Sequence, residues 1–212
     1  MDKMISNYKS LEENLKNLTS EHISKYDLNK TGLFIVDMNN GFAKEGALYS
    51  PRVENIISPI ADFAKVLSNK INKLVAFTDT HEENSVELNS YPIHCLKGDK
   101  ESQIVDELLS IDNIEIIEKN STNGFFAMDI ESYSDLDNFI VVGCCTDICV
   151  YQFVLTLKAY FNQNNLDKNI IVPMNLVETY DIDNVHCGDL LNTVFLSSMI
   201  QNGIKVVKEI LI

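Results

Sequence analysis

Residues 139–150, FIVVGCCTDICV, join an apolar run to the start of an amphipathic helix. The segment Phe139–Val142 has the β-branched and aromatic composition of a buried strand. Gly143 permits a tight turn after that strand, and Thr146 or Asp147 is a suitable N-cap for the helix that follows. The stretch therefore predicts a strand–turn–helix unit of an α/β fold, with cysteines at the carboxyl end of the strand.

The same alternation continues on both sides of this stretch. Five further apolar runs have strand character, at Leu33–Val36, Leu74–Phe77, Ile114–Ile117, Ile170–Val172 and Ile204–Val207. Amphipathic helical stretches lie between most of the strands, at Val53–Ser68, Glu101–Leu109, Asp147–Phe161 and Asn184–Asn202. Continuous apolar strands that alternate with helices predict a parallel sheet covered on both faces, a three-layer α/β/α fold.

The first thirty residues do not follow this alternation. Tyr8, Leu11, Leu15 and Leu18 recur at helical spacing among Asn and Glu residues, which predicts one or two polar helices. We therefore expect an N-terminal helical arm, residues 1–30, followed by one domain, residues 31–212. The arm is expected to pack on that domain or on a partner subunit.

The bulk composition narrows the function classes. With a net charge of -14 and a pI near 4.6, the surface repels phosphate backbones, so we expect no nucleic-acid partner. The apolar runs are strand-sized, so we expect no membrane span. An odd number of cysteines, five, without an N-terminal apolar signal segment favours a reducing, cytoplasmic compartment over a disulfide scaffold.

Ionisable residues follow four successive predicted strands. Asp37 ends the first strand, Asp79 the second and Lys119 the third, and the fourth leads into the cysteines. Any one polar residue at a strand end can simply mark the approach to solvent. In an open parallel sheet, however, ligands bind outside the carboxyl ends of the strands. Four such groups together therefore favour an active site at that edge.

Cys149 is the best candidate for a nucleophile among these cysteines. It lies in the first turn of the predicted helix, where the helix dipole and free amides favour a thiolate and lower its pKa. The same amides can hold a developing oxyanion. Cys144 and Cys145 precede the cap and gain less from that field. A lone cysteine would be interpreted as core packing, but the nearby carboxylate and lysine favour chemistry.

A second cluster follows the strand that ends at Asp79. His81 lies two residues further on, and His94 follows after a short loop. A carboxylate with two imidazoles suits a divalent metal with open positions, and Glu87, or less well Glu82 or Glu83, is a candidate fourth ligand. The residues alone leave metal binding and an ordinary acidic surface loop equally open.

The other histidines and two of the cysteines receive structural interpretations. His22 lies in the arm, and His186 opens the last predicted helix. Cys95 and Cys187 are expected to be packing residues.

The motifs resemble those of the isochorismatase-like cysteine hydrolases, and within that family the nicotinamidases. The resemblance runs from about Gly32 to the C-terminus. Three segments carry it in the family's order, IVDMNNGF around Asp37, IIEKN around Lys119 and GCCTDICV ending just after Cys149. The resemblance implies a six-stranded parallel sheet and a triad of Asp37, Lys119 and Cys149. It also implies a cis peptide at Cys144–Cys145 and an oxyanion hole formed by the amides of Cys145 and Cys149.

The metal loop determines which branch of the family the chain resembles. Nicotinamidases carry Asp-x-His and then Pro-x-His-Cys, which correspond to Asp79–His81 and Pro92–Cys95. The resemblance implies a divalent metal on Asp79, His81 and His94, zinc first and iron or manganese as alternatives. It further implies Glu87 as an added ligand and Phe42 and Phe125 as aromatic walls of the substrate pocket. The chain departs from the family at Asn39–Gly41, where Gln-Asn-Asp is common, and has no Trp.

The resulting expectation is a metal-assisted deamidation of nicotinamide to nicotinate and ammonia through a thioester on Cys149. A homo-oligomer is also expected, since such assembly is common in the family. Another small amide, ureido or vinyl-ether substrate is the first alternative. A thiol redox or metal-storage module that uses Cys144, Cys145 and Cys149, and a non-catalytic binding protein, are further alternatives. Both fit the spacing and the intact triad less well.

Overall fold

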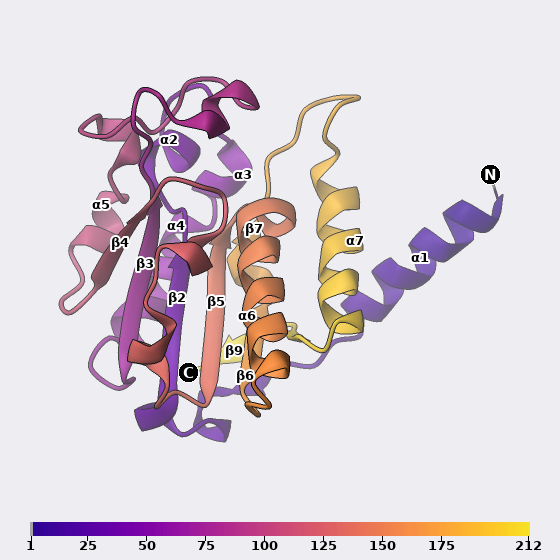
Figure 1. Ribbon diagram of the computed structural model, residues 1–212. Helices are drawn as coiled ribbons and strands as arrows, with labels where there is room; N and C mark the ends of the chain where they lie inside the picture. Colours follow the sequence, from indigo (N-terminus) through magenta and orange to yellow (C-terminus); the bar gives the residue numbers. More distant parts are fainter. Residues whose placement is uncertain (1) are drawn as a thin grey trace.

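A parallel sheet forms the centre of the molecule in the computed structural model, which describes residues 2–212 (Figure 1). Its strands run in the order β4-β3-β2-β5-β6-β8, and every neighbouring pair is parallel. A two-residue strand, β7, pairs with β5 off this path. The predicted six-stranded, mainly parallel sheet is confirmed. Its bounds are β2 Thr31–Val36, β3 Lys73–Asp79, β4 Glu115–Lys119, β5 Asn138–Cys144, β6 Asn169–Pro173, β7 Val177–Glu178 and β8 Lys205–Val207.

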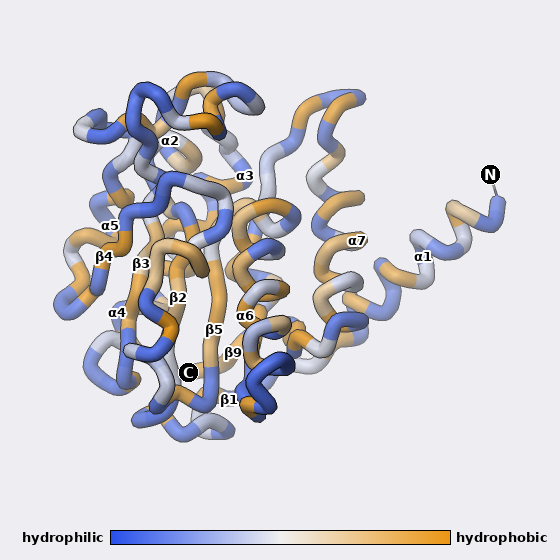
Figure 2. The backbone as a smooth tube through the Cα atoms, in the orientation of Figure 1, coloured by the Kyte–Doolittle hydropathy of each residue, from blue (hydrophilic) through white to orange (hydrophobic). Residues whose placement is uncertain are grey.

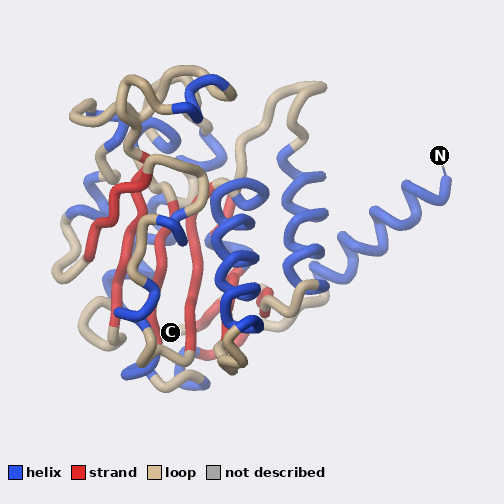
Figure 3. The backbone as a smooth tube through the Cα atoms, viewed as in Figure 1, coloured by secondary structure: helices blue, strands red, loops and turns tan. Residues whose placement is uncertain are grey.

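Helices cover both faces of this sheet, as the predicted three-layer fold requires (Figure 3). Side chains alternate along β2, so Leu33 and Ile35 enter one core and Phe34 and Val36 the other. The first core holds α4, and the second holds α6 and α7. Strand segments are accordingly apolar through the middle of the molecule (Figure 2). The helices are α2 Asn40–Ala43, α3 Pro51–Glu54, α4 Ile57–Leu67, α5 Asp106–Leu109, α6 Tyr151–Gln163 and α7 Gly188–Gln201.

The four predicted helices differ from those observed. The α-helix predicted from Asp147 begins at Tyr151, after a π-helical turn. The stretch Val53–Ser68 is divided between α3 and α4. Within Glu101–Leu109 only the last four residues are α-helical, because Gln103 O accepts from Asn40 N and Val105 N donates to Met38 O. These tertiary hydrogen bonds hold the segment extended. The last helix begins at Gly188 rather than Asn184, since residues 180–187 form a loop. Single 3-10 turns occupy Ile23–Lys25, Leu28–Lys30, Val86–Asn89, Lys100–Ser102, Gly124–Phe126, Ile130–Tyr133 and Met174–Leu176.

The strand order changes direction between β2 and β5. After β2 the chain adds β3 and β4 on one side, and it then returns to place β5 and β6 on the other. Crevices at such switch points, outside the carboxyl ends of the strands, are the usual ligand sites of open α/β sheets. Gly143 makes the close approach here possible. Its φ is +114°, and a Cβ on it would lie 2.0 Å from Val36 O.

The N-terminal helix α1 (Asp2–Lys16) projects from the body beside α7 (Figure 1). Only Leu15 is buried within it, and Tyr8 Oη lies 3.5 Å from Thr193 Oγ1 of α7. Residues 17–30 are not a second helix. They hold two 3-10 turns and β1 (Glu21–His22), which pairs with β9 (Ile210–Leu211). The division into arm and domain, the homo-oligomer and the cytoplasmic location stay predictions. Among residues 2–212, no helix has the length and apolarity needed to cross a membrane.

Candidate active site

The carboxyl ends of β2, β3 and β4 bring Asp37, Asp79 and Lys119 into direct contact. Lys119 Nζ lies 2.9 Å from Asp37 Oδ2 and donates to Asp79 Oδ1 at 2.8 Å. It also donates a hydrogen bond to Ser121 O, at 2.9 Å. Two carboxylates and a carbonyl oxygen thus surround the buried ammonium. The sequence-based expectation that these strand ends converge is met.

Asp37 is held in an uncommon backbone conformation. Its φ is +51°, in the left-handed region, and its amide donates to Phe77 O at 3.1 Å. A non-glycine residue in that region costs of order 1–3 kcal/mol and persists only where the surroundings impose it. Neither oxygen of the Asp37 carboxylate has a hydrogen-bond partner in the described residues, and Oδ2 is held only by the ion pair with Lys119. The buried carboxylate therefore has a free oxygen.

Burial dominates the electrostatics of Asp37 and Cys149. Loss of solvent raises the pKa of Asp37 to about 7, although the Lys119 charge opposes the shift. Burial and the charge of Asp37 also raise the pKa of the Cys149 thiol well above its usual range. Burial would lower the pKa of Lys119, but Asp37, Cys149 and Asp79 raise it instead. These directions favour a charged Lys119 and a protonated Cys149.

The turn that carries Cys149 corrects two of the sequence-based expectations. A π-helical turn spans Thr146–Val150, and its N-cap is Cys145 rather than Thr146 or Asp147, because the Asp147 carboxylate is bonded elsewhere. The expected lowering of the Cys149 pKa is wrong, since burial and the charge of Asp37 raise it. The Cys144–Cys145 peptide bond is cis, as the family resemblance implies.

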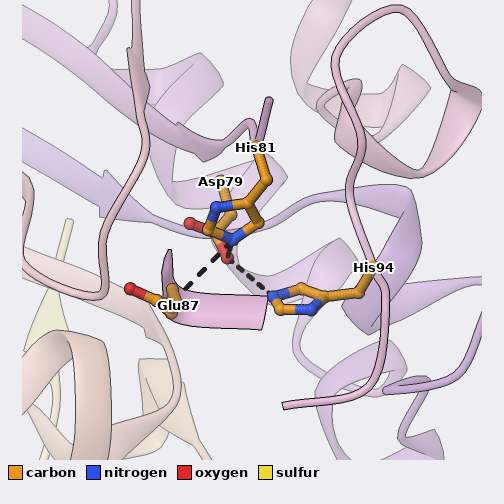
Figure 4. Close-up of side chains that lie close together, drawn as sticks. All are labelled: Asp79, His81, Glu87 and His94. Atoms are coloured by element: carbon orange, nitrogen blue, oxygen red, sulfur yellow. Dashed lines mark hydrogen bonds and ion pairs between the residues drawn. The ribbon is translucent and has the colours of Figure 1, made fainter. Parts of the chain in front are cut away.

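The four candidate metal ligands gather at one point (Figure 4). Their ligand atoms all lie within 4.8 Å of one another. Nε2 of His81 is 3.0 Å and Nε2 of His94 is 3.2 Å from Asp79 Oδ2. Glu87 Oε1 lies 3.9 Å from His81 Nε2, while its Oε2 accepts from the Thr122 amide at 2.9 Å. The structure thus brings together all four residues that the sequence singled out.

The hydrogen bonds of the two imidazoles fit a bound cation. His94 Nδ1 lies 2.7 Å from Pro92 O, which only accepts, so Nδ1 carries a proton. His81 Nδ1 lies 3.1 Å from Asn120 Oδ1. Rings protonated at Nδ1 present Nε2 lone pairs toward the Asp79 carboxylate, an arrangement that a cation between them stabilises. Second partners on Nδ1 are typical of histidines that bind metals.

The backbone around Asp79 is fixed by a residue without a predicted role. Asn39 Nδ2 donates to Asp79 O and to Ser102 O, both at 2.9 Å, and its Oδ1 accepts from the Asp79 amide at 3.3 Å. Its amide therefore ties the loop after β2 to the end of β3. A buried Asn with an amide that satisfies three backbone groups is evident only from tertiary contacts, and the sequence offered no signal for it.

A cavity of about 320 Å³ opens beside these groups. It is lined by Asp37, Asp79, His94 and Cys149, so the nucleophile candidate and the metal cluster share one space. Phe42 lines it as expected. Phe125 does not, which corrects the second predicted wall, because the 3-10 turn of residues 124–126 places its ring against Phe126 and Tyr160.

Two tyrosines supply aromatic surface that the sequence did not reveal. Tyr91 and Tyr180 line the cavity from loops that are far apart in the sequence, and burial raises the pKa of Tyr180 to about 12. The charged lining is acidic. It consists of four carboxylates, with no Lys or Arg among the described residues that line the cavity: Asp37, Asp79, Glu87 and Asp181.

Comparison with known proteins assigns the chain to a family. The model of the isochorismatase domain matches residues 31–193. The chain belongs to the isochorismatase family. This membership confirms the predicted family and α/β fold. A curated relative, nicotinamidase 1 of Arabidopsis thaliana, is 28% identical over 172 residues, 71% of this chain and 70% of that protein. That similarity supports the expected enzyme class, a hydrolase acting on an amide C–N bond.

Solved structures of this fold include enzymes with different named substrates. The pyrazinamidase of Pyrococcus horikoshii, solved in complex with zinc, has a TM-score of 0.66 at 22% identity and covers 84% of this chain and 98% of its own. The N-carbamoylsarcosine amidase of Thermoplasma acidophilum has a TM-score of 0.69, also at 22% identity, with coverages of 84% and 95%. At these identities the likeness establishes the fold alone.

Proposed function

We propose that this protein deamidates nicotinamide to nicotinate and ammonia through a thioester on Cys149. The observation that carries the proposal is the position of Asp79, which contacts both Lys119 of the candidate triad and the two histidines of the metal cluster. A ring held at the metal cluster and a carboxamide held at Cys149 would occupy the same cavity. The similarity to a nicotinamidase supports this substrate.

In the proposed reaction Asp37 is the general base and acid. Its free oxygen accepts the proton of the Cys149 thiol, and the fixed charge of Lys119 stabilises the anions that form. The thiolate attacks the carboxamide carbon while the amides of Cys145 and Cys149 hold the oxyanion. Asp37 then returns the proton to the leaving ammonia. A water molecule, deprotonated by Asp37, hydrolyses the thioester.

Asp79, His81 and His94 would hold a divalent ion, with Glu87 within reach as a fourth ligand. When bound, such an ion supplies a Lewis acid that accepts the pyridine nitrogen and so orients the carboxamide. We propose zinc, with iron or manganese as alternatives, since nitrogen and oxygen ligands of this kind suit all three. The zinc complex of the Pyrococcus pyrazinamidase supports the first choice.

The acidic lining favours a neutral substrate over an anionic one. Four carboxylates surround the cavity without a Lys or Arg in its described lining. A substrate with its own carboxylate, such as an N-carbamoyl amino acid, would find no Lys or Arg in that lining, and the proposed metal ion is assigned to the ring nitrogen. Nicotinamide is uncharged. The charge pattern therefore supports a carboxamide over ureido acids, the principal alternative within the family.

The redox alternative is less consistent with the surroundings of the cysteines. Cys144 is buried and donates from its thiol to Asp37 O at 3.0 Å. Cys149 faces a carboxylate and a lysine, the partners of a nucleophile. A structural role alone would not require the buried charges on Asp37 and Lys119.

The decisive experiment measures ammonia release by metal-loaded protein from nicotinamide, pyrazinamide and N-carbamoylsarcosine. We expect turnover of the two ring carboxamides and little of the third compound. Cys149→Ala should abolish turnover and leave the metal content unchanged, whereas Cys187→Ala, at an exposed cysteine, should retain it. Absence of ammonia release from both ring carboxamides would contradict the proposal.

A further inference from the structure

The loop between β7 and α7, residues 180–187, forms one wall of the cavity. Tyr180, Asp181 and Ile182 line the cavity. The loop closes on itself through two backbone hydrogen bonds of 2.9 Å, from Ile182 N to His186 O and from His186 N to Ile182 O. His186 is thus fixed within the loop that carries the Tyr180 wall, ahead of α7 rather than inside it.

His186 joins this loop to the turn that carries Cys149. Its Nε2 lies 2.9 Å from Asp147 Oδ2, and its Nδ1 lies 3.0 Å from Tyr180 O. Its ring stacks on Tyr180 with centroids 3.6 Å apart and planes 19° from parallel. Tyr180 O and the Asp147 carboxylate are both acceptors, so each ring nitrogen faces one hydrogen-bond acceptor.

Asp147 is the other half of the link. It lies two residues before Cys149 in the π-helical turn, and its Oδ1 accepts from Thr179 Oγ1 at 2.5 Å. The side chains of Asp147 and His186 are 6% and 11% exposed, which limits screening of the pair by solvent. One carboxylate therefore connects the nucleophile's turn both to the residue after β7 and to the aromatic wall.

We propose that His186 is a positioning residue, which sets the Tyr180 wall against the turn that carries Cys149. Its only described polar side-chain contacts are with Asp147 and Tyr180, so it acts through them and not on the reacting atoms. Without it, Tyr180 loses a stacked partner and the Cys149 turn loses one of its two side-chain anchors. A displacement of about 1 Å at a reacting group is enough to cost roughly 100-fold in rate.

The test measures kcat and KM for nicotinamide in His186→Ala, with His22→Ala as the control at an exposed histidine. This kinetic test with nicotinamide rests on the proposed function. We expect kcat/KM to fall about 10- to 100-fold in His186→Ala, with KM raised, and to be unchanged in His22→Ala. His186→Gln keeps an N–H for Asp147 and should lose less. A value within twofold of the parent protein in His186→Ala would overturn the proposal.

A double-mutant cycle separates positioning from general destabilisation. Asp147→Asn, His186→Ala and the double variant should show non-additive effects on kcat/KM, because both single changes break the same link. Full additivity would overturn the proposal. The rate of Cys149 alkylation by iodoacetamide, followed by peptide mass, gives a readout that needs no substrate. If nicotinamide proves not to be a substrate, His186→Ala must still change that rate, and an unchanged rate would count against the link.

Discussion

Lys119 donates a hydrogen bond of 2.8 Å to Oδ1 of Asp79, the residue whose other oxygen faces the two histidines. The same ammonium lies 2.9 Å from Asp37. One buried cation thus contacts carboxylates that belong to two different groups of residues, the candidate triad and the metal cluster. Asp79 responds strongly, because Lys119 and the histidines lower its pKa despite the opposing effect of burial. The two halves of the site are therefore electrostatically coupled.

Replacement of Lys119 by methionine should destabilise the fold as well as stop catalysis. The change leaves Asp37 and Asp79 buried without their common cation, and removal of one partner from a buried ion pair costs about 3–5 kcal/mol. Urea unfolding at neutral pH measures the free energy of unfolding. Lys97→Met is the matched control, since Lys97 pairs with Glu82 at the surface and such pairs contribute about 0–1 kcal/mol. Equal effects of the two changes would contradict the coupled arrangement.

Reactivity of Cys149 should decrease as the pH falls through about 7. Burial and Asp37 raise the pKa of its thiol, so we expect reaction to require the Asp37 carboxylate, whose pKa burial raises to about 7. The rate of Cys149 alkylation by iodoacetamide in metal-free protein, measured from pH 5.5 to 8.5, follows this ionisation. Asp37→Asn should react slowly and without that dependence. A profile shared by the parent and the variant would remove Asp37 as the base.

The Asp37 carboxyl should lower the free energy of unfolding over the same rise in pH that increases the reactivity of Cys149. The folded carboxyl, with its raised pKa, binds a proton between about pH 4 and 7, whereas the unfolded chain has released it. This group therefore stabilises the fold fully below about pH 4, and its contribution is lost as the pH rises to 7. The free energy of unfolding of the parent minus that of Asp37→Asn should decrease across this window. An increase would contradict the sign of the shift.

Strand ends were predictable from the sequence because they follow from chain connectivity. Asp37, Asp79 and Lys119 each end an apolar run, and parallel strands bring such ends to one edge whatever the surrounding loops do. The environment of those residues was not predictable. The pKa of Cys149 depends on burial and on Asp37, neither of which a helix-start argument includes.

Loop residues were predicted less reliably. His94 lies at the cluster because His81 and Leu96 form a short parallel bridge, and here the family motif supplied what spacing could not. The prediction of Phe125 as a wall of the pocket is wrong, because a 3-10 turn capped by Asn123 directs its ring toward α6. His186 is predicted only to open the last helix. Its link to Asp147 joins positions 39 residues apart, and local sequence patterns do not reveal such a contact.

Loss of Asn120 should weaken metal binding without removal of a ligand. Its Oδ1 lies 3.1 Å from Nδ1 of His81 and orients that ring. Changes to such partners of metal-binding histidines typically cost 10- to 100-fold in affinity. Competition with a chromophoric chelator gives the zinc affinity of Asn120→Ala. Asn113→Ala, at an exposed asparagine away from the site, is the control, and an affinity equal to the parent's in Asn120→Ala would contradict this role.

Gly143→Ala tests whether the close packing of β2 and β5 positions the site. At φ +114° an alanine pays roughly 1–3 kcal/mol in backbone strain, and its Cβ would also lie 2.0 Å from Val36 O. Val36 precedes Asp37, and Gly143 leads to the turn that carries Cys149. Relief of that clash must therefore move Asp37 and Cys149 apart. Gly98→Ala is the control. At φ +91°, with no atom within 4 Å of the new Cβ, it should add backbone strain without a clash. We therefore expect a larger loss of unfolding free energy for Gly143→Ala, together with slower Cys149 alkylation. Parent-like alkylation in the folded variant would mean that the contact between Gly143 and Val36 does not set the distance between base and nucleophile.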